Sequence, residues 1–158
     1  MENPRDIDPL LQRLWILWGP LVAAPWLIVG VSFVASVENP ELAQLRLVLF
    51  GVACAVAVGS LGASLVLAPR LREQAFARGT APSQAIFTSF VVANALCEAG
   101  GTTAAVFFLM TKWMPLLGVV ALGSLGCLLH RPDRDSLVEW FQQARRDAPR
   151  PAQPGGSV

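Results

Sequence analysis

One acidic residue stands in the middle of a long apolar stretch, and it is the first candidate for chemistry in this chain. Glu98 lies about halfway along the segment 83–110. Asn94 and Thr102 lie four residues before and after it, which places the three side chains on one face of a helix. A charge in the middle of a bilayer costs at least about 2.5–3.5 kcal/mol, so an intramembrane carboxylate indicates a functional site.

Two interpretations of Glu98 follow from its position. In the first, Glu98 binds a proton or a cation such as Na⁺, and Asn94 and Thr102 supply oxygen ligands or hydrogen bonds. Desolvation favours the neutral carboxyl, so Glu98 would hold a proton until a positive partner approaches. In the second, a protonated Glu98 forms a hydrogen bond to a neighbouring helix or to a second copy of the chain. The residues alone leave both interpretations open.

The segments that position these residues are apolar and long. Hydrophobic residues make up 54% of the 158 positions and charged residues 15%, against roughly 25% charged in soluble domains. About 20 apolar residues cross a bilayer as a helix. We therefore predict an all-α membrane protein, a four-transmembrane-helix bundle with spans at about 14–37, 45–67, 83–110 and 113–129. Pro20 and Pro25 should kink or unwind the first span, and residues 70–82 should form a polar loop.

The basic residues predict the orientation of these spans. Of the 12 Lys and Arg residues, two lie before the first span, three in the middle loop and five after the last span. The other two connections carry Arg46 and Lys112 alone. Cytoplasmic loops carry an excess of Lys and Arg. We expect a multi-pass protein of the cell inner membrane with both termini in the cytoplasm, the N-terminal one being the segment 1–13.

A stripe of small residues marks the second span. The residues recur at a spacing of four and are Gly51, Ala55, Gly59 and Ala63. Such a stripe makes a flat helix face that another backbone can approach closely. It predicts helix packing, with self-association into a homo-oligomer or contact with a membrane-complex partner.

The C-terminal region has a different pattern. In residues 131–148 the apolar positions recur at the spacing of an amphipathic helix, with polar and charged residues on the other face. Residues 149–158 have too little apolar surface to fold. Either the helix is solvated with a modest apolar side, or it lies on the inner membrane surface. In the second case, which we favour, the residues that contact the bilayer would be Trp140, Phe141, Arg145 and Arg146.

Several classes of function find no support in the sequence. There is no Ser/His/Asp set, no phosphate loop and no basic stripe with interleaved aromatics, so we expect neither an enzyme nor a nucleic-acid-binding protein. Cys54, Cys97 and Cys127 lack metal-site spacing and are interpreted as small hydrophobic residues. His130 is interpreted as an interfacial residue. We expect no catalytic residue, no metal site and no cofactor beyond H⁺ or Na⁺.

Residues 51–110 resemble the hairpin of rotary ATPase c subunits. That family has a first helix rich in small residues, a basic cytoplasmic loop and a second helix with one mid-membrane carboxylate. The matching parts here are the stretch that begins at Gly51, the loop with Arg72 and Arg78, and Ala95-Leu-Cys-Glu-Ala-Gly-Gly. The resemblance implies that Glu98 is an ion-carrying carboxylate. The rival expectation is a structural or assembly subunit in which Glu98 is an interhelical hydrogen-bonding residue.

Overall fold

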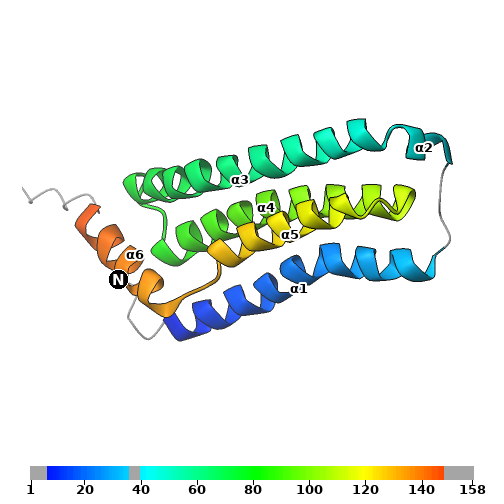
Figure 1. Ribbon diagram of the computed structural model, residues 1–158. Coiled ribbons are helices and arrows are strands. Elements are labelled where there is room, and N and C mark those ends of the chain that lie inside the picture. The colour runs from blue at the N-terminus through cyan, green and yellow to red at the C-terminus, as the bar shows by residue number, and fades with distance from the viewer. Residues whose placement is uncertain (1–6, 36–39, 148–158) are drawn as a thin grey trace, which may run out of the picture.

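The computed structural model describes residues 7–35 and 40–147 and is helical almost throughout (Figure 1). The predicted terminal tail 149–158 lies outside the described residues. The helices, in chain order, are α1 (Ile7–Val34), α2 (Pro40–Gln44), α3 (Arg46–Ala77), α4 (Pro82–Thr111), α5 (Pro115–Leu129) and α6 (Arg134–Asp147). The described part of the chain holds no strand, which agrees with the predicted all-α class.

Helix α4 is the centre of the bundle. It packs against α1, α3 and α5, and Figure 1 shows α1 and α3 on opposite sides of the α4–α5 pair. In their most apolar stretches, 44% of the residues of α4 are buried inside the chain, against 17% for α1 and 17% for α3. The remaining apolar side chains of α1 and α3 therefore face outward, as lipid-facing side chains do.

Three helices, α1, α3 and α4, are long and apolar enough to cross a membrane. Helix α5 has 15 residues, which at about 1.5 Å per residue is shorter than a hydrocarbon core of about 30 Å. A fourth crossing is reached if α5 and α6, bent by 55° at their junction, count together as one span. The described residues thus form a helical membrane-type bundle with three to four candidate spans.

Two helices extend beyond the predicted limits. Helix α3 continues through Pro69 to Ala77, so the polar loop predicted over 70–82 was wrong for most of its length. The physical reason is that Ser64, Ala68 and Phe76 continue one buried row past the proline, and this burial outweighs the single lost backbone donor. The real connection is short and is closed by Gly79, whose φ of +73° suits a helix C-terminus.

Helix α1 begins at Ile7, within the predicted N-terminal segment, and runs without a break through Pro20 and Pro25. The predicted unwinding at the prolines is therefore absent, although the helix axis bends along its length (Figure 1). Two hydrogen bonds from indole N–H groups join α1 to α5. Trp18 Nε1 donates to the carbonyl of Cys127 at 2.9 Å, and Trp26 Nε1 donates to Ser124 Oγ at 2.8 Å.

Helix α6 packs across one end of the bundle, beside the start of α1 (Figure 1). Its Leu137, Phe141 and Ala144 are buried in a cluster with residues from α1, α3 and α4. Asp133 precedes the helix and accepts a hydrogen bond from the Ser136 backbone N–H at 3.3 Å, an N-terminal cap. The apolar face of the predicted amphipathic helix is thus covered by the protein itself.

Candidate functional site

Glu98 lies near the middle of α4 and is partly exposed. Thr102 Oγ1 donates a hydrogen bond of 2.7 Å to Glu98 Oε1, so these two predicted site residues are brought together. Within residues 7–35 and 40–147, no basic side chain forms an ion pair with Glu98. A Cβ atom added at Gly101, three residues further along, would lie 3.3 Å from Pro25 Cγ of α1 and 3.6 Å from the Val120 carbonyl of α5. Glu98 is therefore close to the part of α4 that packs against these two helices.

Asn94 is completely buried one turn before Glu98. Its Nδ2 donates to the carbonyl of Phe90 at 3.1 Å, and its Oδ1 is buried without a hydrogen-bond partner. No hydrogen bond joins Asn94 to Glu98 among the described contacts. The third predicted site residue is therefore a neighbour with one unused acceptor, and it is not bonded to the carboxyl group.

A polar chain across α3, α4 and α5 was not predicted from the sequence. Cys97 Sγ donates to Ser64 Oγ at 3.3 Å, and Ser64 Oγ lies 3.0 Å from His130 Nε2. Ser64 gives its own hydroxyl proton to the carbonyl of Leu61 at 2.7 Å, so His130 Nε2 must be the donor to Ser64. The positions of Cys97 and His130 in the sequence carried no periodic signal for this contact, which depends on how three helices meet.

The predicted small-residue stripe does not make the contacts inside the bundle. Gly51, Ala55 and Gly59 are exposed and Ala63 is partly buried. A Cβ atom added at Gly51 or Gly59 would meet nothing within 4 Å. The stripe therefore lies on the outer face of α3, where it is open to lipid or to another protein.

The close contacts are made by other small residues. A Cβ atom added at Gly100 would lie 2.7 Å from the Ala57 Cα atom, and one added at Gly123 would lie 2.7 Å from the Gly101 Cα atom. Ala53 and Ala57 of α3 are buried. Small residues allow the α3–α4 and α4–α5 backbones to approach. On α3 these are Ala53 and Ala57, which form a different row from the predicted stripe.

The four predicted membrane-interface residues have different surroundings. Phe141 is 7% exposed and packs within the bundle, so its side chain is taken up by the protein and is not free to enter a bilayer. Trp140 is partly buried, with the Arg72 guanidinium carbon 4.1 Å from its ring centroid. Arg146 is exposed, and the Arg145 side chain lies outside the described part of the structure.

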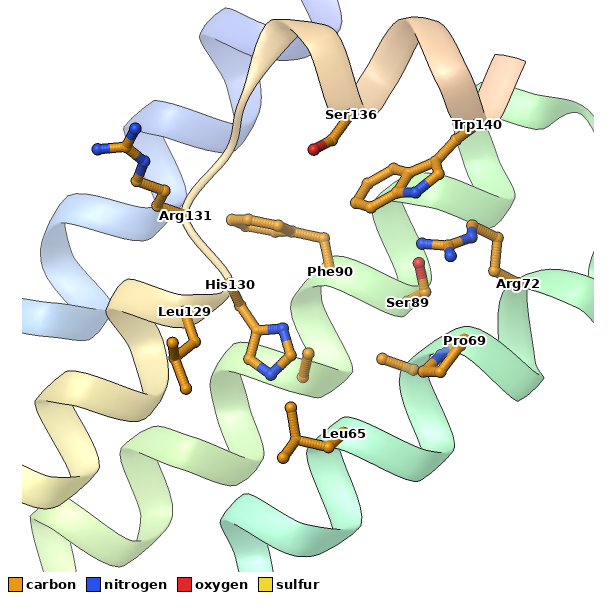
Figure 2. Close-up of a pocket in the computed structure, with 12 residues that line it drawn as sticks. Leu65, Pro69, Arg72, Ser89, Phe90, Leu129, His130, Arg131, Ser136 and Trp140 are labelled. Atoms are coloured by element: carbon orange, nitrogen blue, oxygen red, sulfur yellow. The ribbon is translucent and has the colours of Figure 1, made fainter. Parts of the chain in front are cut away.

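A pocket of about 250 Å³ opens at this same end of the bundle, between α3, α4 and α6 (Figure 2). We call it the end pocket. Its polar lining residues are Arg72, Ser89, His130, Arg131 and Ser136. The rest of its wall is apolar, with Phe90 and Trp140 as the aromatic members. The sequence predicts a loop at Arg72, so it does not predict this pocket.

The comparisons with known proteins give no family. No protein-family model, no curated protein and no solved structure matches this chain. Within the described residues, no group of three or more His, Cys, Asp and Glu side chains is placed to hold a metal ion.

Proposed function

We propose that this chain is a non-enzymatic, four-crossing protein of the inner membrane in which Glu98 binds a proton. The observation that carries the proposal is the partly exposed carboxyl of Glu98, which has one hydrogen bond from Thr102 and no ion pair among the described residues. A neutral acid avoids the cost of a bare charge at this depth. Oε1 accepts the Thr102 hydroxyl, which leaves the second oxygen to carry the proton.

A proton suits these surroundings better than Na⁺ does. A bound metal cation is held by several oxygen ligands. Here, among the described residues around Glu98, only two side chains with oxygen atoms, Glu98 and Thr102, are in contact with each other. The unpaired Oδ1 of Asn94 is the next acceptor along the helix. We also propose that both termini are cytoplasmic. This is supported by the common end of the bundle at which α6, the start of α1 and the α3–α4 connection lie (Figure 1), because the arginine-rich segments are at that end.

Labelling with a carboxyl-reactive carbodiimide tests the Glu98 proposal. The reagent adds to protonated carboxyl groups, so the purified protein in liposomes should acquire one adduct that peptide mapping places at Glu98. Glu98→Gln should abolish this adduct, and Glu73→Gln, at an exposed position of α3, should not. If the extent of Glu98 labelling falls as the pH rises and does not change with added Na⁺, the site binds a proton. If added Na⁺ protects Glu98 from the reagent, the site binds a cation. An unlabelled Glu98 would contradict both.

The second candidate function is a structural or assembly subunit. It is favoured by the outer face of α3, where Gly51 and Gly59 have open space beside them and exposed valines and leucines flank them. If this candidate is right, Gly59→Leu should abolish self-association or partner binding in native mass spectrometry, and Glu98→Gln should leave assembly and biological function intact. In that case Glu98 is an interhelical hydrogen-bonding residue.

A further inference from the structure

The guanidinium of Arg72 is a cation with fewer hydrogen-bond acceptors around it than it has donors to offer. Its Nε atom is buried and has no hydrogen-bond partner, and its guanidinium lies against the ring of Trp140. A buried donor without an acceptor loses its hydrogen bonds to water and gains none from the protein. The arrangement is therefore more favourable when an acceptor from outside the described chain reaches the guanidinium.

The end pocket gives such an acceptor room and polar contacts. Figure 2 shows the Arg72 guanidinium between Ser89 and Trp140, with Ser136 on the facing helix. Arg131 extends away from this group in the same view. The lining includes no Asp or Glu side chain. The two hydroxyl groups give their protons elsewhere, Ser89 to the carbonyl of Ile86 at 2.9 Å and Ser136 to the carboxylate of Asp133 at 3.4 Å. The donor left for an incoming group is therefore the guanidinium of Arg72, whose Nε has no partner. Guanidinium groups bind phosphate through paired N–H donors, so this part of the pocket is complementary to an oxyanion.

The rim of the end pocket distinguishes among the sources of that oxyanion. Leu65 of α3 and Leu129 of α5 line the pocket and are 51% and 69% exposed. Both lie on the bundle surface that faces lipid when α3 and α5 cross a membrane. The pocket thus has a cationic wall toward the end of the bundle and an apolar edge toward its middle, which matches a phosphate headgroup joined to acyl chains.

We propose that the end pocket binds the phosphate of an anionic phospholipid, with Arg72 on the phosphate and an acyl chain along Leu65 and Leu129. Trp140 covers the guanidinium from the α6 side, so a bound lipid also fastens α6 to the bundle. The proposal goes beyond the role of Glu98 and needs only that the helices are embedded in a membrane. A failure of the Glu98 labelling experiment would leave it standing.

Native mass spectrometry of the detergent-purified protein tests this proposal. The protein is titrated with phosphatidylglycerol and, separately, with phosphatidylcholine. The wild type should retain phosphatidylglycerol more tightly, and Arg72→Gln should weaken that binding about tenfold, the equivalent of about 1.4 kcal/mol. Arg70→Gln is the matched control, because Arg70 is exposed, lies two residues away and does not line the pocket; its binding should equal that of the wild type.

A second variant guards against a folding defect in Arg72→Gln. Ser136→Leu fills part of the pocket and keeps the cation, so it should also lose phosphatidylglycerol while its thermal unfolding in detergent stays close to that of the wild type. The proposal is overturned if all variants bind phosphatidylglycerol equally. It is also overturned if inorganic phosphate raises the thermal stability of the wild type but not of Arg72→Gln and no lipid is retained, because the ligand is then a soluble anion.

Discussion

At Gly100 the backbone of α4 comes within contact distance of the α3 backbone, and at Gly59 the helix surface is open. Both residues are helical glycines in apolar segments, and their local sequences do not distinguish them. The difference arises because two small-residue rows run along α3 and the bundle uses one of them. Glu98 shows the same limit. Its contact with Thr102 was predictable from their spacing of four residues, whereas the lack of a hydrogen bond between Asn94 and Glu98 among the described contacts was not.

The two glycines yield a stability prediction with opposite signs. Gly100→Ala adds a methyl group that would lie 2.7 Å from the Ala57 Cα atom, and such overpacking costs about 1–3 kcal/mol. Gly59→Ala meets open space and should be neutral or stabilising by up to about 1 kcal/mol, because alanine favours helix. Thermal unfolding in detergent measures both. Equal melting temperatures for Gly100→Ala and the wild type would contradict the observed α3–α4 packing.

Helix α6 illustrates what is decided at the scale of an element. Its amphipathic pattern predicted the helix closely, and the structure places it at Arg134–Asp147. The pattern could not say what covers the apolar face, because a membrane surface and a protein surface both satisfy it. The structure supplies a protein surface, formed by apolar residues of α1, α3 and α4.

Removal of the buried Phe141 ring should detach α6 without unfolding the bundle. Phe141→Ala deletes a buried ring, a change that costs about 3–5 kcal/mol in protein cores. We expect faster hydrogen exchange over residues 134–147 and unchanged exchange in α4. Gln142→Ala, at an exposed neighbouring position, is the control and should leave α6 protected. If Phe141→Ala leaves α6 protected as well, the helix is held by something other than this cluster.

For the whole molecule, the arrangement of the helix ends makes the topology testable. The start of α1, the α3–α4 connection and α6 share one end of the bundle, and the α4–α5 turn is at the other (Figure 1). Lys112 reinforces that far end, because its Nζ donates to the carbonyl of Ala35 at 3.1 Å. Of the ten basic residues within the described ranges, eight belong to segments at the first end and the other two are Arg46 and Lys112, so we predict the first end to be cytoplasmic.

Cysteine labelling in intact cells checks this topology and the fourth crossing. Met114, Arg78 and Gln142 are exposed and can be replaced singly by cysteine. A membrane-impermeant maleimide should label Met114→Cys in intact cells. It should label Arg78→Cys and Gln142→Cys only after the cells have been permeabilised. The wild type reports the background from the native cysteines, of which Cys97 and Cys127 are buried. Labelling of Gln142→Cys from outside would mean that α5 does not cross.

The sequence alone determined the helical class, the long apolar segments and the isolated carboxylate, because each depends on composition and on short-range spacing along one helix. Tertiary structure decided which small row of α3 faces α4, where α3 ends, what covers α6, and that Arg72 lines a pocket. Those features depend on which helix faces meet. Where several faces are about equally apolar, periodicity cannot choose among them, and the choice falls to close packing between helices.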